Sequence, residues 1–179
     1  MTNSQLIGPI VSTADIDHPD SLAVMRRYLA DVIASYYGRP ATEQEIADQF
    51  VQDPNDCLKP PAGGFLVARR GTEVVGCVGV RRMGEGFVEL KRMFVVPAAR
   101  RTGVAAALLR AAEDAARELG GHAMRLDTRS DLVEARGLYA KHGYTEIDPY
   151  SGGPYADHFF EKALHADATK VANQHRAGI

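Results

Sequence analysis

The stretch RRTGVA, residues 100–105, links a strand-like run to a helix-like run, and this junction constrains the chain more than any other segment. The preceding MFVVP favours a strand, and the following AALLRAAEDAARELG repeats apolar residues at helical spacing. The first turn of a helix has backbone N–H groups without partners and partial positive charge. Gly103 permits close approach of a ligand and Arg100 and Arg101 add charge, so the junction predicts a phosphate site. Glycine at a helix start also serves packing alone, and the junction by itself leaves both interpretations open.

The spacing of apolar residues predicts an α/β (α+β) single domain over residues 1–164 with a mixed sheet, in the order β-α-α-β-β-β-α-β-α-β-β. A turn at Gly71 and Thr72 predicts a hairpin. Residues 52–64 are expected to form a loop, and the polar C-terminal tail, residues 165–179, is expected to be poorly ordered. Strands are expected at 6–11, 64–70, 73–83, 87–96, 123–128, 144–147 and 158–164, and helices at 19–37, 42–51, 104–119 and 131–142.

The composition argues against several kinds of partner. A net charge of -2 gives no reason to expect nucleic acid, and no apolar stretch approaches the roughly 20 residues of a membrane span. Cys57 and Cys77 lie far apart without CxxC or Cys/His spacing, so neither a metal site nor a disulfide framework is expected. The P-loop pattern GxxxxGK[ST] and the dinucleotide pattern GxGxxG are both absent. We therefore expect a cytoplasmic protein that binds no metal, nucleic acid or membrane.

Several ordered segments of the C-terminal half resemble the GNAT superfamily of acetyl-CoA-dependent N-acetyltransferases. RRTGVA carries the family motif [RQ]xxGx[GA], with Arg100, Gly103 and Ala105 in the defined places. The flanking segments that match are VELKRMFVVP, AALLRAAEDAARELG, MRLDT, EARGLYAKHGY and YADHFFEKAL. Many family members have Asn three residues before the alanine matched by Ala135, whereas this chain has Leu132, so a side-chain contact to the cofactor is not carried over there. The resemblance implies a mostly antiparallel central sheet flanked by helices.

The resemblance also implies that acetyl-CoA is the donor and that no metal takes part. The pantetheine arm would pair with the strand at Met93, Phe94 and Val95. A backbone N–H of Phe94 or Met93 would polarise the thioester carbonyl. The pyrophosphate would lie on the loop and helix start formed by Arg100, Arg101, Thr102, Gly103, Val104 and Ala105.

Two side chains are candidates for proton transfer. A lysine-like amine titrates near pH ~10.4, so some group must accept its proton. Glu89 is the candidate base, and at about 3.3 Å per residue it lies about 13 to 16 Å from Phe94, which suits a relay through ordered water or a grip on the substrate. A solvated strand acid is the alternative for Glu89. Tyr139 matches the family's general-acid tyrosine and would protonate the departing thiolate, with a half-buried core tyrosine as the alternative.

The expected acceptor is a primary amine of a small molecule. Lys91 and Arg92 alternate along a strand, so at most one is expected to point into a given cleft. Arg92, with its bidentate fork, is the candidate for binding an acceptor carboxylate, and Tyr155 is a candidate acceptor contact. A protein lysine or N-terminus as acceptor, and a non-catalytic acyl-CoA sensor, stay open as alternatives. A homodimer through the last strands stays open as well.

Overall fold

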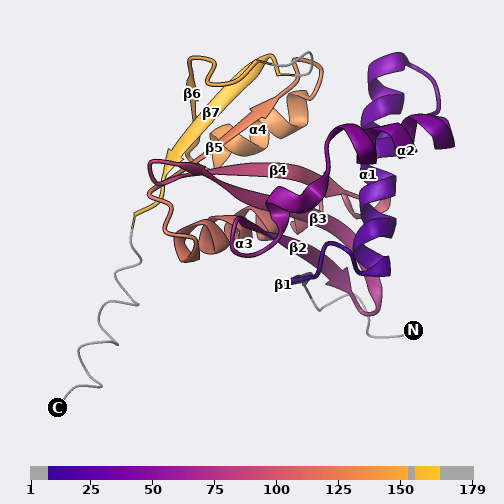
Figure 1. Ribbon diagram of the computed structural model, residues 1–179, viewed down its shortest axis with the longest axis horizontal. Helices are drawn as coiled ribbons and strands as arrows, with labels where there is room; N and C mark the ends of the chain where they lie inside the picture. Colours follow the sequence, from indigo (N-terminus) through magenta and orange to yellow (C-terminus); the bar gives the residue numbers. More distant parts are fainter. Residues whose placement is uncertain (1–7, 153–155, 166–179) are drawn as a thin grey trace.

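A seven-stranded sheet forms the centre of the protein in the computed structural model, which describes residues 8–152 and 156–165 (Figure 1). The strand order is β1-β2-β3-β4-β5-β7-β6, and among the described neighbours only β4 and β5 run parallel. This confirms the predicted element order and the mixed, mostly antiparallel sheet. The strands are β1 Ile10–Thr13, β2 Gly63–Arg70, β3 Glu73–Gly84, β4 Phe87–Val95, β5 Ala123–Thr128, β6 Thr145–Ile147 and β7 His158–Ala163.

Helices cover both faces of the sheet (Figure 1). On one face, which we call the α1 face, the ring of Tyr28 in α1 packs against Phe94, with 6.2 Å between centroids. On the opposite face, the α3 face, Val104 and Leu108 of α3 lie against Gly76 of β3. The helices are α1 Pro19–Tyr37, α2 Glu43–Gln52, α3 Val104–Glu118 and α4 Val133–Lys141, and the short 3-10 helices are η1 Asn55–Leu58 and η2 Pro97–Ala99.

The central strands are buried on both faces because helices lie on both sides. In β3 every residue from Val75 to Val80 is buried, without the alternation expected of a strand with one wet face. Two of these buried positions are glycines, and a Cβ at Gly76 would meet the carbonyl oxygen of Phe94 at 2.7 Å. The small residues of β3 therefore let helices from both faces approach the sheet closely.

Local signals in the sequence fix the first two helices. α1 ends at Gly38, whose φ of 66° is left-handed, as expected for a glycine that stops a helix. α2 begins with the predicted capping box, in which the Thr42 hydroxyl accepts from the Glu45 N–H and the Glu45 carboxylate accepts from the Thr42 N–H. The predicted hairpin turn at Gly71 is also present, with φ of 58°.

The structure differs from the predicted elements at several boundaries. The strand expected at 6–11 is β1, Ile10–Thr13, in the described residues. The expected loop 52–64 contains η1, and β2 begins within it at Gly63. The helix expected from Asp131 begins at Val133, because Leu132 occupies the N-cap position without a capping side-chain bond. Tyr155 and the tail beyond His165 lie outside the described residues. Within the described part, no helix has the length and apolar character needed to cross a membrane.

The ion pair between Arg39 and Glu45, in the connection between α1 and α2, should weaken at low pH. The Arg39 guanidinium, with the Thr42 N–H, lowers the pKa of Glu45 from 4.5 to about 2. A depressed pKa means that this carboxylate favours the folded state above pH 4.5, and the contribution is lost as the pH falls through about 2. We expect an NMR titration of Glu45 to show a midpoint near 2 and Arg39→Met to raise it. An unchanged midpoint in Arg39→Met would contradict the pairing.

Candidate active site

The parallel strands β4 and β5 separate part-way along their length (Figure 1). They pair only from Phe87 to Glu89 on β4 and from Ala123 to Arg125 on β5. β4 then continues to Val95, so in the described chain its last residues have no strand neighbour on that side. An extended ligand can bind such an edge through the backbone, as an added strand would. Met93, Phe94 and Val95 lie in this part of β4, which pairs with β3 on one side and has no strand neighbour on the other.

The loop after β4 enters α3 through two left-handed residues. Arg101 has φ of 58°, and Gly103, the N-cap of α3, has φ of 86°. No side chain caps this helix, and no atom lies within 4 Å of the Cβ position of Gly103. The first N–H groups of α3, at Val104 and Ala105, therefore have no capping side chain and adjoin open space. Such a helix start can accept an anion, because its first N–H groups lack side-chain partners.

Two further arginines hold this loop in place. Arg100 forms an ion pair with Asp31 of α1 at 3.1 Å. Arg70 of β2 donates to the Thr102 hydroxyl at 2.5 Å, and that hydroxyl donates to the carbonyl of Ala99 at 2.5 Å. Arg70 was not singled out from the sequence, since it precedes the loop by about thirty residues and only the sheet brings it there. The loop is thus tied to α1 through Arg100 and to β2 through Arg70.

Tyr139 of α4 reaches the opening between β4 and β5 from the α3 face. Its hydroxyl donates to the sulfur of Met93 at 3.8 Å, and its ring packs against Tyr144 and Phe160. Burial raises the pKa of Tyr139 well above its usual range of about 10, so the phenol stays protonated at neutral pH. The structure therefore places a proton donor beside the unpaired part of β4.

Glu89 faces the other side of the sheet and is almost fully buried, with 3% of its surface exposed. One carboxylate oxygen accepts from Arg81 Nε at 2.5 Å, and the other accepts from the hydroxyl of Tyr150 at 3.2 Å. Burial, followed by the charge of Glu89, raises the pKa of Tyr150. The alternative of a solvated strand acid is therefore wrong for Glu89, because both of its oxygens have protein partners inside the fold.

The strand alternation expected for Lys91 and Arg92 is wrong. Arg92 has φ of 57°, and the pairing of β4 with β3 shifts register at this point, which marks a β-bulge. Both side chains consequently reach one carboxylate: Asp53 lies 2.8 Å from Arg92 and 3.6 Å from Lys91. Arg92 also donates to the carbonyl of Asp53, and its guanidinium lies 5.8 Å from the ring centroid of Tyr28. The sequence did not predict the bulge, because its left-handed residue is Arg92 and not the glycine that commonly marks such a backbone conformation.

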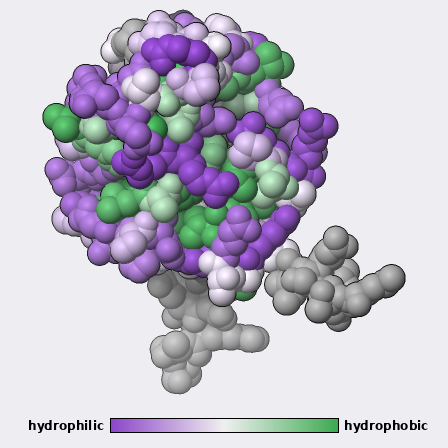
Figure 2. All heavy atoms as spheres, turned by 90° about the vertical axis from the view of Figure 1, so that its right-hand side faces the viewer, coloured by the Kyte–Doolittle hydropathy of each residue, from purple (hydrophilic) through white to green (hydrophobic). Residues whose placement is uncertain are grey.

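A groove of about 700 Å³ lies between α1, the α1–α2 connection and the end of β4. Its floor is largely apolar, whereas Arg27 and Arg39 bring positive charge. Arg39 is neutralised by Glu45 at 2.6 Å, while Arg27 has no ion pair with any described residue. Figure 2 shows this side of the molecule, where apolar surface lies among hydrophilic side chains. The lining residues are Arg27, Ala30, Asp31, Ala34, Gly38, Arg39, Pro40, Ala41, Phe94 and Pro97.

The described candidate residues lie along β4, on both faces of the sheet and in the loop that follows the strand. The loop from Arg100 to Ala105 lies at its end, Tyr139 on the α3 face and Glu89 on the α1 face. Sequence reasoning considered Arg81 and Tyr150 for the acceptor side and did not predict that they bind Glu89, nor that Asp53 binds Arg92, although Arg81 and Glu89 could have been paired from the hairpin register. It also did not single out Asp127, the acid in MRLDT. Strand alternation places Asp127 on the same face as Arg125.

Comparison with known proteins agrees with this geometry. Residues 27–144, more than half of the chain, match the family described as "Acetyltransferase (GNAT) family". The "IAA acetyltransferase" of Azospirillum brasilense is 36% identical over 143 residues, covering 77% of this chain and 84% of that protein. The "Uncharacterized N-acetyltransferase YjgM" of Escherichia coli is 30% identical over 136 residues, covering 74% of this chain and 78% of that protein.

Solved structures give the same fold. An acetyltransferase of the GNAT family from Staphylococcus aureus superposes with a TM-score of 0.70 at 16% identity, covering 87% of this chain and 100% of that one. The PaiA N-acetyltransferase from Thermoplasma acidophilum, solved in complex with coenzyme A, superposes with a TM-score of 0.67 at 17% identity, covering 88% and 99%. The chain is therefore an N-acetyltransferase that belongs to the GNAT family, whose members use acetyl-CoA and an acceptor substrate.

Proposed function

We propose that this protein transfers the acetyl group of acetyl-CoA to a primary amine of a small molecule. The observation that carries the proposal is the separation of β4 from β5 beside the uncapped start of α3. It provides an edge for an extended arm and a cradle for a diphosphate in one continuous surface. Acetyl-CoA has both parts, and it supplies the activated thioester when bound.

The donor would be held by the end of β4 and by the loop that follows it. Met93, Phe94 and Val95 would bind the pantetheine arm, and an N–H of Phe94 or Met93 would polarise the carbonyl. The absence of a capping side chain and the lack of a Cβ at Gly103 would let the diphosphate approach the first N–H groups of α3 closely. The diphosphate would be bound by Arg100, Arg101, Thr102, Gly103, Val104 and Ala105.

The two groups proposed for proton transfer, Tyr139 and Glu89, lie on opposite faces of the sheet. Tyr139 would donate to the departing sulfur, which its raised pKa permits because the phenol remains protonated. Glu89 would draw protons from the amine through a relay, since Arg81 and Tyr150 hold its oxygens within the α1 face. The two groups are therefore separated by the opening in which the reaction would occur.

The groove on the α1 side supports a small acceptor over a protein. Its volume of about 700 Å³ is that of a small-molecule site, and its apolar floor ends at Phe94. An acceptor carboxylate would find Arg27 unpaired, whereas the proposed contact Arg92 is already bound to Asp53. Tyr155 remains a proposal for the acceptor side. A homodimer is likewise a proposal, with β6 at an edge of the sheet available for pairing.

The central test is thiol release from acetyl-CoA over a panel of benzylamine, ethanolamine, putrescine and free lysine, together with calorimetry of acetyl-CoA binding. We expect binding and turnover with at least one amine. Binding without turnover on these or on peptide amines would support an acyl-CoA sensor, and turnover on peptides alone would support a protein acetyltransferase. Absence of binding would refute the proposal.

Tyr139→Phe tests the proton donor. The variant keeps the ring contacts with Tyr144 and Phe160 and loses only the hydroxyl, so folding should be preserved. We expect kcat to fall about 100-fold with little change in acetyl-CoA affinity, as for the loss of one general acid. Steady-state kinetics and calorimetry measure both quantities. An unchanged kcat would remove Tyr139 from the mechanism.

A further inference from the structure

The end of β5 carries an acid that the mechanism above does not use. Asp127 lies two residues beyond Arg125, where the pairing of β4 with β5 stops. Side chains alternate along a strand, so Asp127 shares the α1 face with Arg125 and with Glu89, the strand partner of Arg125. Asp127 is exposed, and it has no hydrogen bond or ion pair with any described residue.

The charges next to Asp127 on this face are already paired. Side chains at the level of Glu89 form a row across the neighbouring strands. In this row Arg81 pairs with Glu89 at 2.5 Å, and Arg125 pairs with Glu161 at 2.7 Å. Each carboxylate in that row has its own cation, which leaves none of them free for a cationic substrate.

The next row lies closer to the loop that follows β4. There Lys91 stands on β4 and Asp127 on β5, at the level where the two strands have separated. Lys91 turns toward Asp53 at 3.6 Å, and the residue paired with Asp127 on β7 is the apolar Phe159. By strand geometry Asp127 is about 7 Å nearer than Glu89 to the level of Phe94. It is the acid of this face that combines exposure with a place at the opening.

We infer that Asp127 binds the protonated amino group of the acceptor and accepts its proton at the opening between β4 and β5. This inference rests on the proposed acetyl transfer and names the group that the amine meets first. Asp127 then takes the place of the relay to Glu89, and Glu89, whose oxygens are held by Arg81 and Tyr150, lies behind it on the same face.

The electrostatic surroundings support this role. Asp127 is accessible to solvent, but neighbouring protein atoms still withdraw part of the water around its carboxylate. This desolvation, followed by the charge of Glu89, raises the pKa of Asp127, while Lys91 and Arg81 oppose the rise. The charge of Asp127 in turn raises the pKa of Tyr139, which places Asp127 near the proposed proton donor. The titratable groups that face Asp127 are Glu89 and Lys91 from β4, Arg81 from β3, Tyr139 from α4 and Tyr150 from the β6–β7 connection. A carboxylate with a raised pKa is a better base near neutral pH.

The nitrogen of the acceptor loses two protons during the reaction. The ammonium gives one proton to the Asp127 carboxylate, which later releases it to solvent. The freed nitrogen forms a bond to the carbonyl carbon, the carbon–sulfur bond breaks, and sulfur takes the electron pair. Tyr139 gives a proton to that sulfur. The second proton that the nitrogen loses then restores the phenol of Tyr139. The products are the amide, the free thiol and one proton.

Asp127→Asn tests the inference with two nucleophiles. One is the best primary amine of the panel above, and the other is hydroxylamine, which is largely unprotonated at neutral pH. We expect kcat/KM for the amine to fall about 100-fold, while hydroxylamine changes less than about threefold, because only the ammonium needs a base. The loss for the amine should shrink as the pH rises toward ~10, where free amine becomes abundant. Asp127→Glu should restore part of the activity.

Controls separate the role of Asp127 from folding and from the proposed function. Glu73→Gln removes an exposed carboxylate at the start of β3 and should change neither rate. Acetyl-CoA affinity should be unchanged in Asp127→Asn. Equal losses for both nucleophiles, or no loss for the amine, would overturn the inference while leaving acetyl transfer intact. A wild-type protein that transfers acetyl to no amine would overturn both.

Discussion

Gly103→Val is expected to weaken acetyl-CoA binding about 100-fold, a loss of about 2.7 kcal/mol of binding free energy. Gly103 has φ of 86°, a conformation that a β-branched residue adopts only under strain. The valine would either shift the first N–H groups of α3 away from the diphosphate or place its methyl groups in the open space where the diphosphate is proposed to lie. Calorimetry with acetyl-CoA measures the change.

A matched control exists at the other end of the same helix. Gly120 has φ of 81°, and no atom lies within 4 Å of its Cβ position either. Gly120→Val therefore introduces the same backbone strain and should lower the melting temperature by a similar amount. It should leave acetyl-CoA affinity unchanged. Equal affinity losses in the two variants would mean that strain, and not the diphosphate site, explains the result at Gly103.

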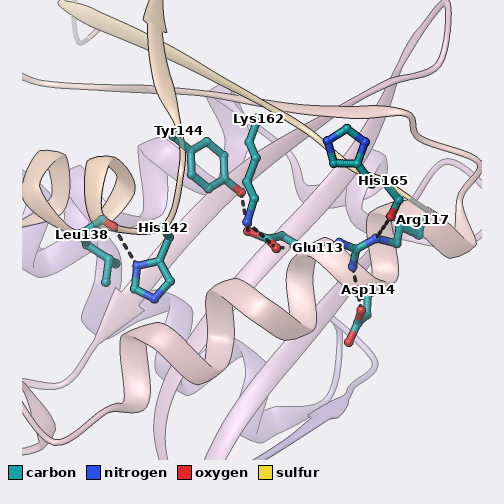
Figure 3. A network of polar contacts seen from close by, with 8 residues as sticks. All are labelled: Glu113, Asp114, Arg117, Leu138, His142, Tyr144, Lys162 and His165. Atoms are coloured by element: carbon teal, nitrogen blue, oxygen red, sulfur yellow. Dashed lines mark hydrogen bonds and ion pairs between the residues drawn. The ribbon is translucent and has the colours of Figure 1, made fainter. Parts of the chain in front are cut away.

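Lys162→Met is expected to destabilise the fold by about 3 kcal/mol, because it removes the nearer cation of a buried carboxylate and leaves only Arg117, at 4.0 Å. Glu113 of α3 is 6% exposed, and its oxygens lie 2.8 and 2.9 Å from Lys162 Nζ (Figure 3). The Tyr144 hydroxyl also donates to Glu113 at 3.1 Å, so the carboxylate joins α3, β7 and the segment before β6. Urea denaturation gives the free energy of unfolding.

Two further variants show whether the burial of this charge is responsible. The double variant Lys162→Met with Glu113→Leu removes both charges and should recover most of the lost stability. Asp114→Asn breaks the neighbouring ion pair with Arg117, but Asp114 is 59% exposed, so we expect a change below about 0.5 kcal/mol. A double variant no more stable than Lys162→Met alone would contradict this account.

The sequence was informative wherever a local signal defines a local structure. The glycine at position 103 and the helical spacing that follows it predicted the start of α3, and the capping box from Thr42 to Glu45 predicted the start of α2. The spacing of apolar residues gave the order of the elements, and the resemblance carried by RRTGVA added the mostly antiparallel sheet. Each of these signals acts within a few residues, which is the range over which backbone conformation and apolar spacing are readable.

The partners of the candidate active site were decided only by the tertiary structure. The bulge at Arg92 brings Lys91 and Arg92 to the same carboxylate, and pairing rules along a regular strand predict the opposite. The pairing of Glu89 with Arg81 and Tyr150, and the place of Asp127 at the opening, depend on strands and loops that are distant in sequence. The sequence therefore determined which segments become strands and helices, and it carries the motif on which the proposed diphosphate site rests. Which charges are paired and which remain free for a substrate was set by sheet register and burial, because charges pair through space and not along the chain.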